Sequence, residues 1–150
     1  MIEDLVSALK KSSLFKNLSD KQIEQVITHL QPRLIILKNG EHLYHRGDPA
    51  DCCWEVLSGH FLLQRGSLRH PFQPLDYHIG AVTGLLGLVE PGAERPVSLI
   101  ADSEVELIEI RGDALSQLDE STRVIIWENI AHILIRKLFH CRSQLATMGE

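Results

Sequence analysis

The sequence predicts a mainly β domain with helices at both ends. A chain of 150 residues has the usual size of a single domain. Between residues 32 and 111, short apolar runs are separated by glycine-containing turns, a pattern typical of an antiparallel barrel or roll. Apolar residues recur at helical spacing before and after this stretch. We therefore expect one domain over 1–150, with N-terminal helices over 1–31, a β-roll over 32–111 and C-terminal helices over 112–150.

Two helices are expected before the β region. Leu5, Val6 and Leu9 would share one face of the first helix. Residues 19–22 (Ser-Asp-Lys-Gln) form a capping-box pattern, in which the serine and the glutamine satisfy each other's backbone N–H groups. Apolar residues follow this box at helical spacing: Ile23, Val26, Ile27 and Leu30. A second helix is therefore expected to begin there.

The strands are indicated by residues that alternate between apolar and other types. The apolar members of this pattern are Trp54, Val56, Phe61, Leu63, Val105 and Leu107. Such alternation predicts half-buried strands, here enclosing a core between two sheets. Beyond Leu107 the apolar positions move by one residue to Ile108 and Ile110, which predicts a bulge or a strand end. Residues 66–76 lack alternation and are expected to form a hairpin excursion.

A long C-terminal helix is expected from about Ser121. One row of residues, spaced 4, 3, 4, 3 and 4 apart, has the pattern of a coiled-coil seam: Trp127, Ala131, Leu134, Leu138, Cys141 and Leu145. A second row, Ile126, Ile130 and Ile133, lies beside it and widens the apolar face. We expect one row to face the roll and the seam to meet a second copy in a homodimer. The alternative is that both rows are buried within one chain.

Composition and charge exclude several classes of partner. The net charge of −5 gives no general attraction to nucleic acid or to an anionic membrane. The first residues carry Glu3 and Asp4 where a signal peptide has basic residues, and no apolar run approaches the ~20 residues of a membrane span. Three cysteines, Cys52, Cys53 and Cys141, suit a reducing compartment. A cytoplasmic protein is expected.

Neither a metal site nor an enzyme is indicated. His42 and His45 would point to opposite faces of a strand, so they would not share an ion with Cys52 and Cys53. The two cysteines would alternate, one in the core and one outward. No motif combines a nucleophile, a histidine base and an oxyanion site, and no pair of carboxylates stands out. We therefore assign no catalytic residue and no metal ligand.

A glycine-rich segment over residues 84–95 is the candidate binding site. It lies between a strand ending near Gly80 and a strand starting near Val97. Glycines such as Gly84 and Gly87 let backbone N–H groups approach an anion closely, and Arg95 can grip a phosphate with its planar guanidinium. The alternative is a surface arginine paired with one of two nearby acids, Glu90 or Glu94.

The sequence resembles the cyclic-nucleotide-binding domain family and, within that family, the catabolite activator protein branch. The resemblance covers nearly the whole chain. It is carried by residues 15–18 (Phe-Lys-Asn-Leu), Gly40-Glu41, Gly47-Asp48, 54–59 (Trp-Glu-Val-Leu-Ser-Gly), Gly80, Gly84, the cassette 87–95, Ala101 and Leu107. It implies a double-stranded β-helix, a jelly-roll-like β-roll, with a long dimerisation helix. It also implies cyclic AMP or cyclic GMP as ligand, with the cyclic phosphate held by Arg95 and backbone amides.

The sequence departs from the family pattern at two positions. Leu85 stands where the family has a glutamate that holds the ribose hydroxyl, and Pro96 replaces a small residue and removes a backbone donor. Family members often continue into a winged-helix DNA-binding domain, but this chain reaches Glu150 just after the long helix, so no DNA-reading element is expected.

Two hypotheses follow for the function. In the first, the domain is a non-enzymatic sensor that binds a cyclic nucleotide or another small anion and signals through the long helix to a partner protein. In the second, it is a degenerate member of the family that dimerises without a ligand. An inward-pointing Arg95 beside free backbone amides and an open cavity would favour the sensor. A filled cavity would favour the second hypothesis, a dimerising protein-interaction module that binds no ligand.

Overall fold

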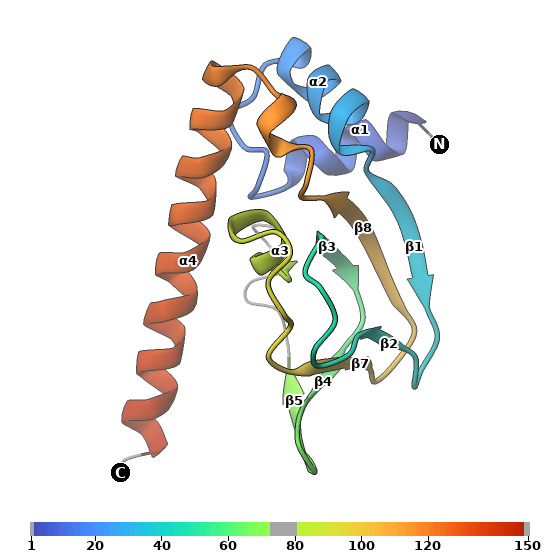
Figure 1. Cartoon of the computed structure of the whole chain (residues 1–150), viewed down its shortest axis with the longest axis vertical. Helices are drawn as coiled ribbons and strands as arrows, with labels where there is room; N and C mark the ends of the chain where they lie inside the picture. Colours follow the sequence, from blue (N-terminus) through green and yellow to red (C-terminus); the bar gives the residue numbers. More distant parts are fainter. Residues whose placement is uncertain (1, 73–80, 149–150) are drawn as a thin grey trace.

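The computed structural model describes the backbone of residues 2–72 and 81–148, and the side chains of 4–69 and 82–139. Within these residues, two helices precede the strands and a long helix follows them (Figure 1). The helical elements are α1 (Ile2–Lys11), α2 (Asp20–Leu30), the short α3 (Leu86–Val89), the 3-10 turn η2 (Leu115–Gln117) and α4 (Glu120–Met148).

The strands form two antiparallel four-stranded sheets. Their bounds are β1 (Arg33–Leu37), β2 (His42–Tyr44), β3 (Cys52–Ser58), β4 (Phe61–Arg65), β5 (Leu68–Phe72), β6 (Ala81–Thr83), β7 (Ser98–Ala101) and β8 (Val105–Arg111). One sheet has the order β1-β8-β3-β6 and the other β2-β7-β4-β5. This arrangement confirms the predicted β-roll with flanking helices. The expected hairpin appears as the β4–β5 pair, and the remainder of its predicted range, residues 73–76, lies outside the described residues.

The β1-β8-β3-β6 sheet separates two hydrophobic cores. The first, the roll core, lies between the two sheets and includes Trp54, Val56, Val105 and Leu107. The second and larger one, the helix-side core, lies between the other face of this sheet and the helices, and includes Cys53, Ile108 and Ile110 from the same strands. In Figure 1, α1 and α2 gather at one end of the sheets and α4 runs along the side of the roll.

The expectation of half-buried strands is wrong for β3 and β8. Successive residues from Cys53 to Val56 are all buried, because the helices cover the sheet face that water would otherwise reach. The same cause explains Ile108 and Ile110, which belong to the helix-side core. β8 therefore continues without a break where a bulge was expected. The register shift lies instead on β3, between Val56 and Ser58.

The capping box predicted for the second helix is present. The backbone N–H of Gln22 donates to the Ser19 hydroxyl over 3.2 Å, and the backbone N–H of Ser19 donates to the Gln22 side chain over 2.8 Å. Two donors that would otherwise lack partners at the helix start are thereby satisfied. α2 then buries Ile23, Val26 and Leu30 in the helix-side core, as their spacing predicts.

A buried asparagine fixes α4 against the connection between α1 and α2. The Asn129 side-chain amide donates to the backbone carbonyls of Leu14 and Lys16 over 2.9 and 2.8 Å. Because these carbonyls lie in irregular chain, they need such a donor when buried. Among the helices that the structure describes, none combines the length and hydrophobicity needed to cross a membrane.

Candidate functional site

The segment over residues 84–95 lies against β3. Strand β6 pairs with β3, so the chain turns from β6 into α3 directly beside Cys52 and Trp54. Gly84 has φ +76°, and a Cβ there would lie 2.6 Å from the Trp54 ring. A Cβ on Gly87 would collide with the backbone carbonyl of Cys52. Both glycines therefore allow β3 to approach closely, and the space beside them is occupied by protein.

Arg95 points into the molecule. Arg95 is only 3% exposed, so the alternative of a surface arginine paired with Glu90 or Glu94 is wrong. One terminal nitrogen, Nη1, donates to the Gly84 carbonyl over 3.2 Å, and the other, Nη2, donates to the Cys52 carbonyl over 2.6 Å. Among the residues whose side chains are described, no carboxylate forms an ion pair with this guanidinium.

The Arg95 guanidinium lies over two aromatic rings. Its Cζ lies 4.5 Å from the Tyr44 ring centre and 5.2 Å from that of Trp54, and the two rings stack at 5.7 Å. A cation over such ring faces is attracted by their electron density. Burial raises the pKa of Tyr44, and the Arg95 charge opposes that rise. Arg95 thus lies in an aromatic clamp built by β2 and β3.

A pocket of about 360 Å³ opens beside this clamp. Arg95, Tyr44 and Trp54 line it together with three acids, Asp48, Asp51 and Glu109, and with Leu43, Pro49 and Cys52. The acids are engaged: Glu109 pairs with Arg33 at 2.9 Å and accepts from the Trp54 indole N–H at 3.1 Å, and Asp48 accepts from the backbone N–H of His45 at 2.8 Å. Asp51 has a side-chain hydrogen bond with Cys52. With three acids and one arginine, the lining does not favour a free anion.

The backbone amides of the candidate cassette are largely engaged. The N–H groups of Gly87 through Glu90 donate to carbonyls of residues 84–86, closing the short helix α3. The Arg95 N–H donates to the Asp48 carbonyl over 2.8 Å. Leu85, at the position where the resemblance implies a glutamate, is buried in the helix-side core. The features expected of an open anion site are therefore only partly present: the arginine points inward, but these amides are occupied.

Two further expectations concern cysteine and histidine. Cys53 is buried and Cys52 is half-buried, as predicted, and burial together with nearby acids raises the pKa of Cys52 to about 12. Such thiols are poor nucleophiles. The prediction that His42 and His45 point apart is wrong: their rings stack at 4.0 Å. Strand β2 ends at Tyr44 and has a register shift, so strict alternation does not reach His45.

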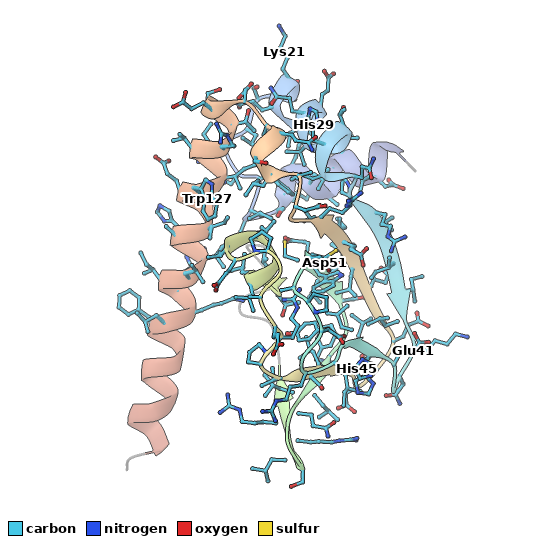
Figure 2. The ribbon with its side chains drawn as sticks, in the orientation of Figure 1. Lys21, His29, Glu41, His45, Asp51 and Trp127 are labelled. Atoms are coloured by element: carbon cyan, nitrogen blue, oxygen red, sulfur yellow. The ribbon has the colours of Figure 1, made fainter. Side chains whose placement is uncertain are left out.

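α4 separates the two apolar rows that the sequence predicts. Ile126, Ile130 and Ile133 are buried against the helix-side core. The seam residues Trp127, Ala131, Leu134 and Leu138 are exposed on the single chain, and Trp127 is labelled on α4 in Figure 2. The side chains of the other two, Cys141 and Leu145, lie outside the described ones. Ile135 and Phe139, which the sequence analysis did not single out, are also exposed.

Sequence reasoning missed the partners of Arg95. Trp54 was predicted only as a core residue, and Tyr44 was not predicted at all. The other partners are backbone carbonyls, which leave no signal in a sequence. A buried carboxyl was also missed: Glu55 accepts from the Ser12 hydroxyl over 2.7 Å. Burial raises the Glu55 pKa to about 7, and the bond from Ser12 opposes this rise.

Comparisons with known proteins agree with this fold. Residues 34–122 match the family model described as the cyclic nucleotide-binding domain. No curated protein sequence matches the chain significantly. The chain is similar in structure to a putative cyclic nucleotide-binding protein from Geobacter metallireducens, with a TM-score of 0.71 and 20% identity. That match covers 88% of this chain and 96% of the other.

Two other solved structures are similar over most of the chain. A cyclic nucleotide-binding domain from Methylobacillus flagellatus matches with a TM-score of 0.75 and 16% identity, covering 97% of this chain and 83% of the other. The catabolite activator protein of Thermus thermophilus matches with a TM-score of 0.67 and 23% identity. That match covers 92% of this chain and 63% of the Thermus protein. At these identities the likeness concerns the fold.

Proposed function

The chain belongs to the cyclic nucleotide-binding domain family, and from that premise we propose that it is a non-catalytic regulatory domain that self-associates through α4. In this proposal Arg95 is a structural residue and no cyclic nucleotide binds at the cassette. The observation that carries the proposal is the engagement of both terminal nitrogens of Arg95 by the carbonyls of Gly84 and Cys52.

A cyclic phosphate would have to displace these contacts to reach the guanidinium. Either the guanidinium would move out of the aromatic clamp of Tyr44 and Trp54, or the phosphate would have to fit beside that clamp. Its negative charge would also meet the acids of the pocket. Leu85 offers no acceptor to a ribose hydroxyl, and a buried hydroxyl without a partner costs about 1–3 kcal/mol, or roughly a tenfold to hundredfold loss of affinity. These terms act in the same direction.

The exposed face of α4 supports self-association. Leu134, Ile135, Leu138 and Phe139 are each 44–59% exposed within six residues. A helix segment that is not packed against other chain gains little stability from propensity alone. A second copy of α4 would cover this face along the predicted seam, as large exposed apolar patches are typical of interaction surfaces. A partner protein would then respond to the dimer.

A second candidate function rests on the inward-pointing guanidinium of Arg95, which lines the pocket. No carboxylate among the described side chains forms an ion pair with it, and a small anion that reached it past the acids of the lining would supply that partner. The volume of about 360 Å³ is within the range of ligand sites, roughly 300–1,000 Å³. In this case the chain would be a sensor of a small anion.

Calorimetric titration with cyclic AMP and cyclic GMP tests the proposal. We expect no heat of binding up to millimolar concentrations. We also expect Arg95→Ala to lower the free energy of unfolding by about 2–4 kcal/mol, because it leaves two buried carbonyls without donors. Arg46→Ala, at an exposed arginine, is the matched control and should stay within about 0.5 kcal/mol of the wild type.

The opposite result would replace the proposal with the sensor hypothesis. Micromolar binding of either nucleotide that disappears in Arg95→Ala, with the unfolding free energy unchanged, would identify Arg95 as a ligand contact. Binding that persists in Arg95→Ala would place the nucleotide elsewhere on the molecule and would leave the structural role of Arg95 intact.

A further inference from the structure

A second pocket, of about 330 Å³, lies between the end of α1, the connection to α2, and α4. Four of the chain's 15 lysines and arginines line it: Lys10, Lys11, Lys16 and Arg136. Among the residues whose side chains are described, no acid lines it. In a protein of net charge −5 this is a local reversal of sign. Focused positive charge of this kind attracts anions.

Most of these cations have no ion-pair partner within the described part of the chain. Lys10 pairs with Asp20 at 2.9 Å. Among the residues with described side chains, no acid forms an ion pair with Lys11, Lys16 or Arg136. His132 adds another nitrogen donor to the lining. The cations come from two parts of the chain more than one hundred residues apart, and all of these side chains lie at an exposed rim.

The floor of the pocket is fixed by hydrogen bonds. Asn129 is buried and holds the carbonyls of Leu14 and Lys16, and Ser12 is buried and donates to Glu55 over 2.7 Å. Asn129, His132 and Arg136 follow one another at intervals of three and four residues, so α4 presents them on one face. A preorganised floor with an exposed, charged rim suits binding of a compact, strongly charged group.

We propose that this pocket binds a small anion with at least two linked phosphate groups. Three cations that have no ion-pair partner among the described side chains match such a charge. A volume of about 330 Å³ equals about eleven water molecules, more than a single phosphate fills. The lining, as far as it is described, holds no Phe, Tyr or Trp on which a base would stack. Recognition would therefore rest on the phosphates. The site is independent of Arg95 and of the proposed function.

Titration with pyrophosphate at low ionic strength tests this site. We expect pyrophosphate to bind more tightly than inorganic phosphate, sulfate or citrate. The double variant Lys16→Ala/Arg136→Ala should bind it about 100-fold more weakly, since each charged contact contributes roughly tenfold. The matched control, Lys21→Ala/Lys38→Ala, removes the same charge at exposed positions outside the pocket, and Lys21 is seen in Figure 2 extending from α2. It should bind like the wild type.

The site assignment fails if pyrophosphate gives no heat, if both double variants weaken binding equally, or if citrate binds as tightly. Nuclear magnetic resonance gives an independent readout. Added pyrophosphate should shift the Asn129 side-chain amide and the Lys16 backbone amide. Shifts confined to Gly84 and the Arg95 side chain would instead mean that the anion binds at the cassette, and would overturn this assignment while supporting the second candidate function.

Discussion

At the residue scale, the most informative feature is that buried charged side chains are satisfied from within the chain. Arg95 is held by two carbonyls and two aromatic rings. The buried Glu55 carboxyl accepts a hydrogen bond from Ser12, and its partners on the neighbouring strands are the apolar Val82 and Ile108. Of the two, Glu55 is the residue whose charge pH can change, because burial raises the pKa of its carboxyl to about 7.

Glu55 should therefore make the protein less stable as the pH rises through neutrality. Burial raises its folded-state pKa from the ordinary 4.5 to about 7, so between these values the folded chain holds a proton that the unfolded chain has lost. The stabilisation is fully present below pH 4.5 and is lost as the pH passes 7, about 3 kcal/mol in all. Urea unfolding across this range measures it.

Glu55→Gln should remove this dependence and keep an acceptor for Ser12. Because other carboxyls also titrate, the useful quantity is the difference between wild-type and variant unfolding free energies at each pH. Glu106→Gln, at an exposed position of β8, is the matched control. Profiles for the wild type and Glu55→Gln that remain parallel from pH 4.5 to pH 8 would contradict the assignment of a raised pKa to Glu55.

At the element scale, α4 carries two different faces. Its buried face holds Ile126, Asn129, Ile130 and Ile133, which fix it to the helix-side core and to the connection after α1. Its exposed face carries the seam. This division accounts for the wide apolar arc of the sequence. The isoleucine row packs within the chain, and the described seam residues are exposed on its surface.

Leu134→Glu should convert a dimer to a folded monomer. Leu134 is 44% exposed on the single chain, so a charge there costs the monomer little but would be buried without a partner in the seam. Light scattering gives the mass, and circular dichroism shows whether the chain is folded. Leu68→Glu, which places the same charge at an exposed leucine of β5, should leave the mass unchanged. A Leu134→Glu protein with the wild-type dimer mass would disprove the seam.

At the scale of the whole molecule, β3 and β8 join the two cores. Each strand contributes alternate residues to the roll core and to the helix-side core. We therefore expect a single cooperative unfolding transition. Trp127→Phe leaves Trp54 as the sole tryptophan and reports on the roll, while far-UV circular dichroism is dominated by the helices. The two midpoints in urea should coincide; separate midpoints would mean that the cores unfold independently.

The features predicted correctly from the sequence were local ones. The capping box at Ser19, the buried isoleucine row of α4 and the glycine-punctuated roll depend on residues close together in the chain. Burial of both faces of β3 was not predictable from alternation, because Glu55 looks like the polar side of a strand. The register shift on β3 was not predicted either, because Leu57, which lies at the shift, is apolar and gives no sign of it in the sequence.

The candidate site was predictable only in part. Gly84, Gly87 and Arg95 indicated where the segment lies, and the inward direction of Arg95 agrees with one of the two alternatives considered. Its partners could not be predicted, because backbone carbonyls have no residue type and Tyr44 comes from a distant strand. The basic pocket was invisible for a similar reason: Lys16 and Arg136 are 120 residues apart and meet only in the fold.

The anchoring of α4 has a mechanical consequence. Among the described side chains, the last that tie α4 to the rest of the chain are Ile133 and Lys137, whose ammonium donates to the Val82 carbonyl over 2.7 Å. From Lys137 to Met148 the helix continues for about 16 Å. A 10° rotation at this fulcrum would move the far end by about 3 Å. A small rotation of α4 at its base would therefore displace its far end by a larger distance.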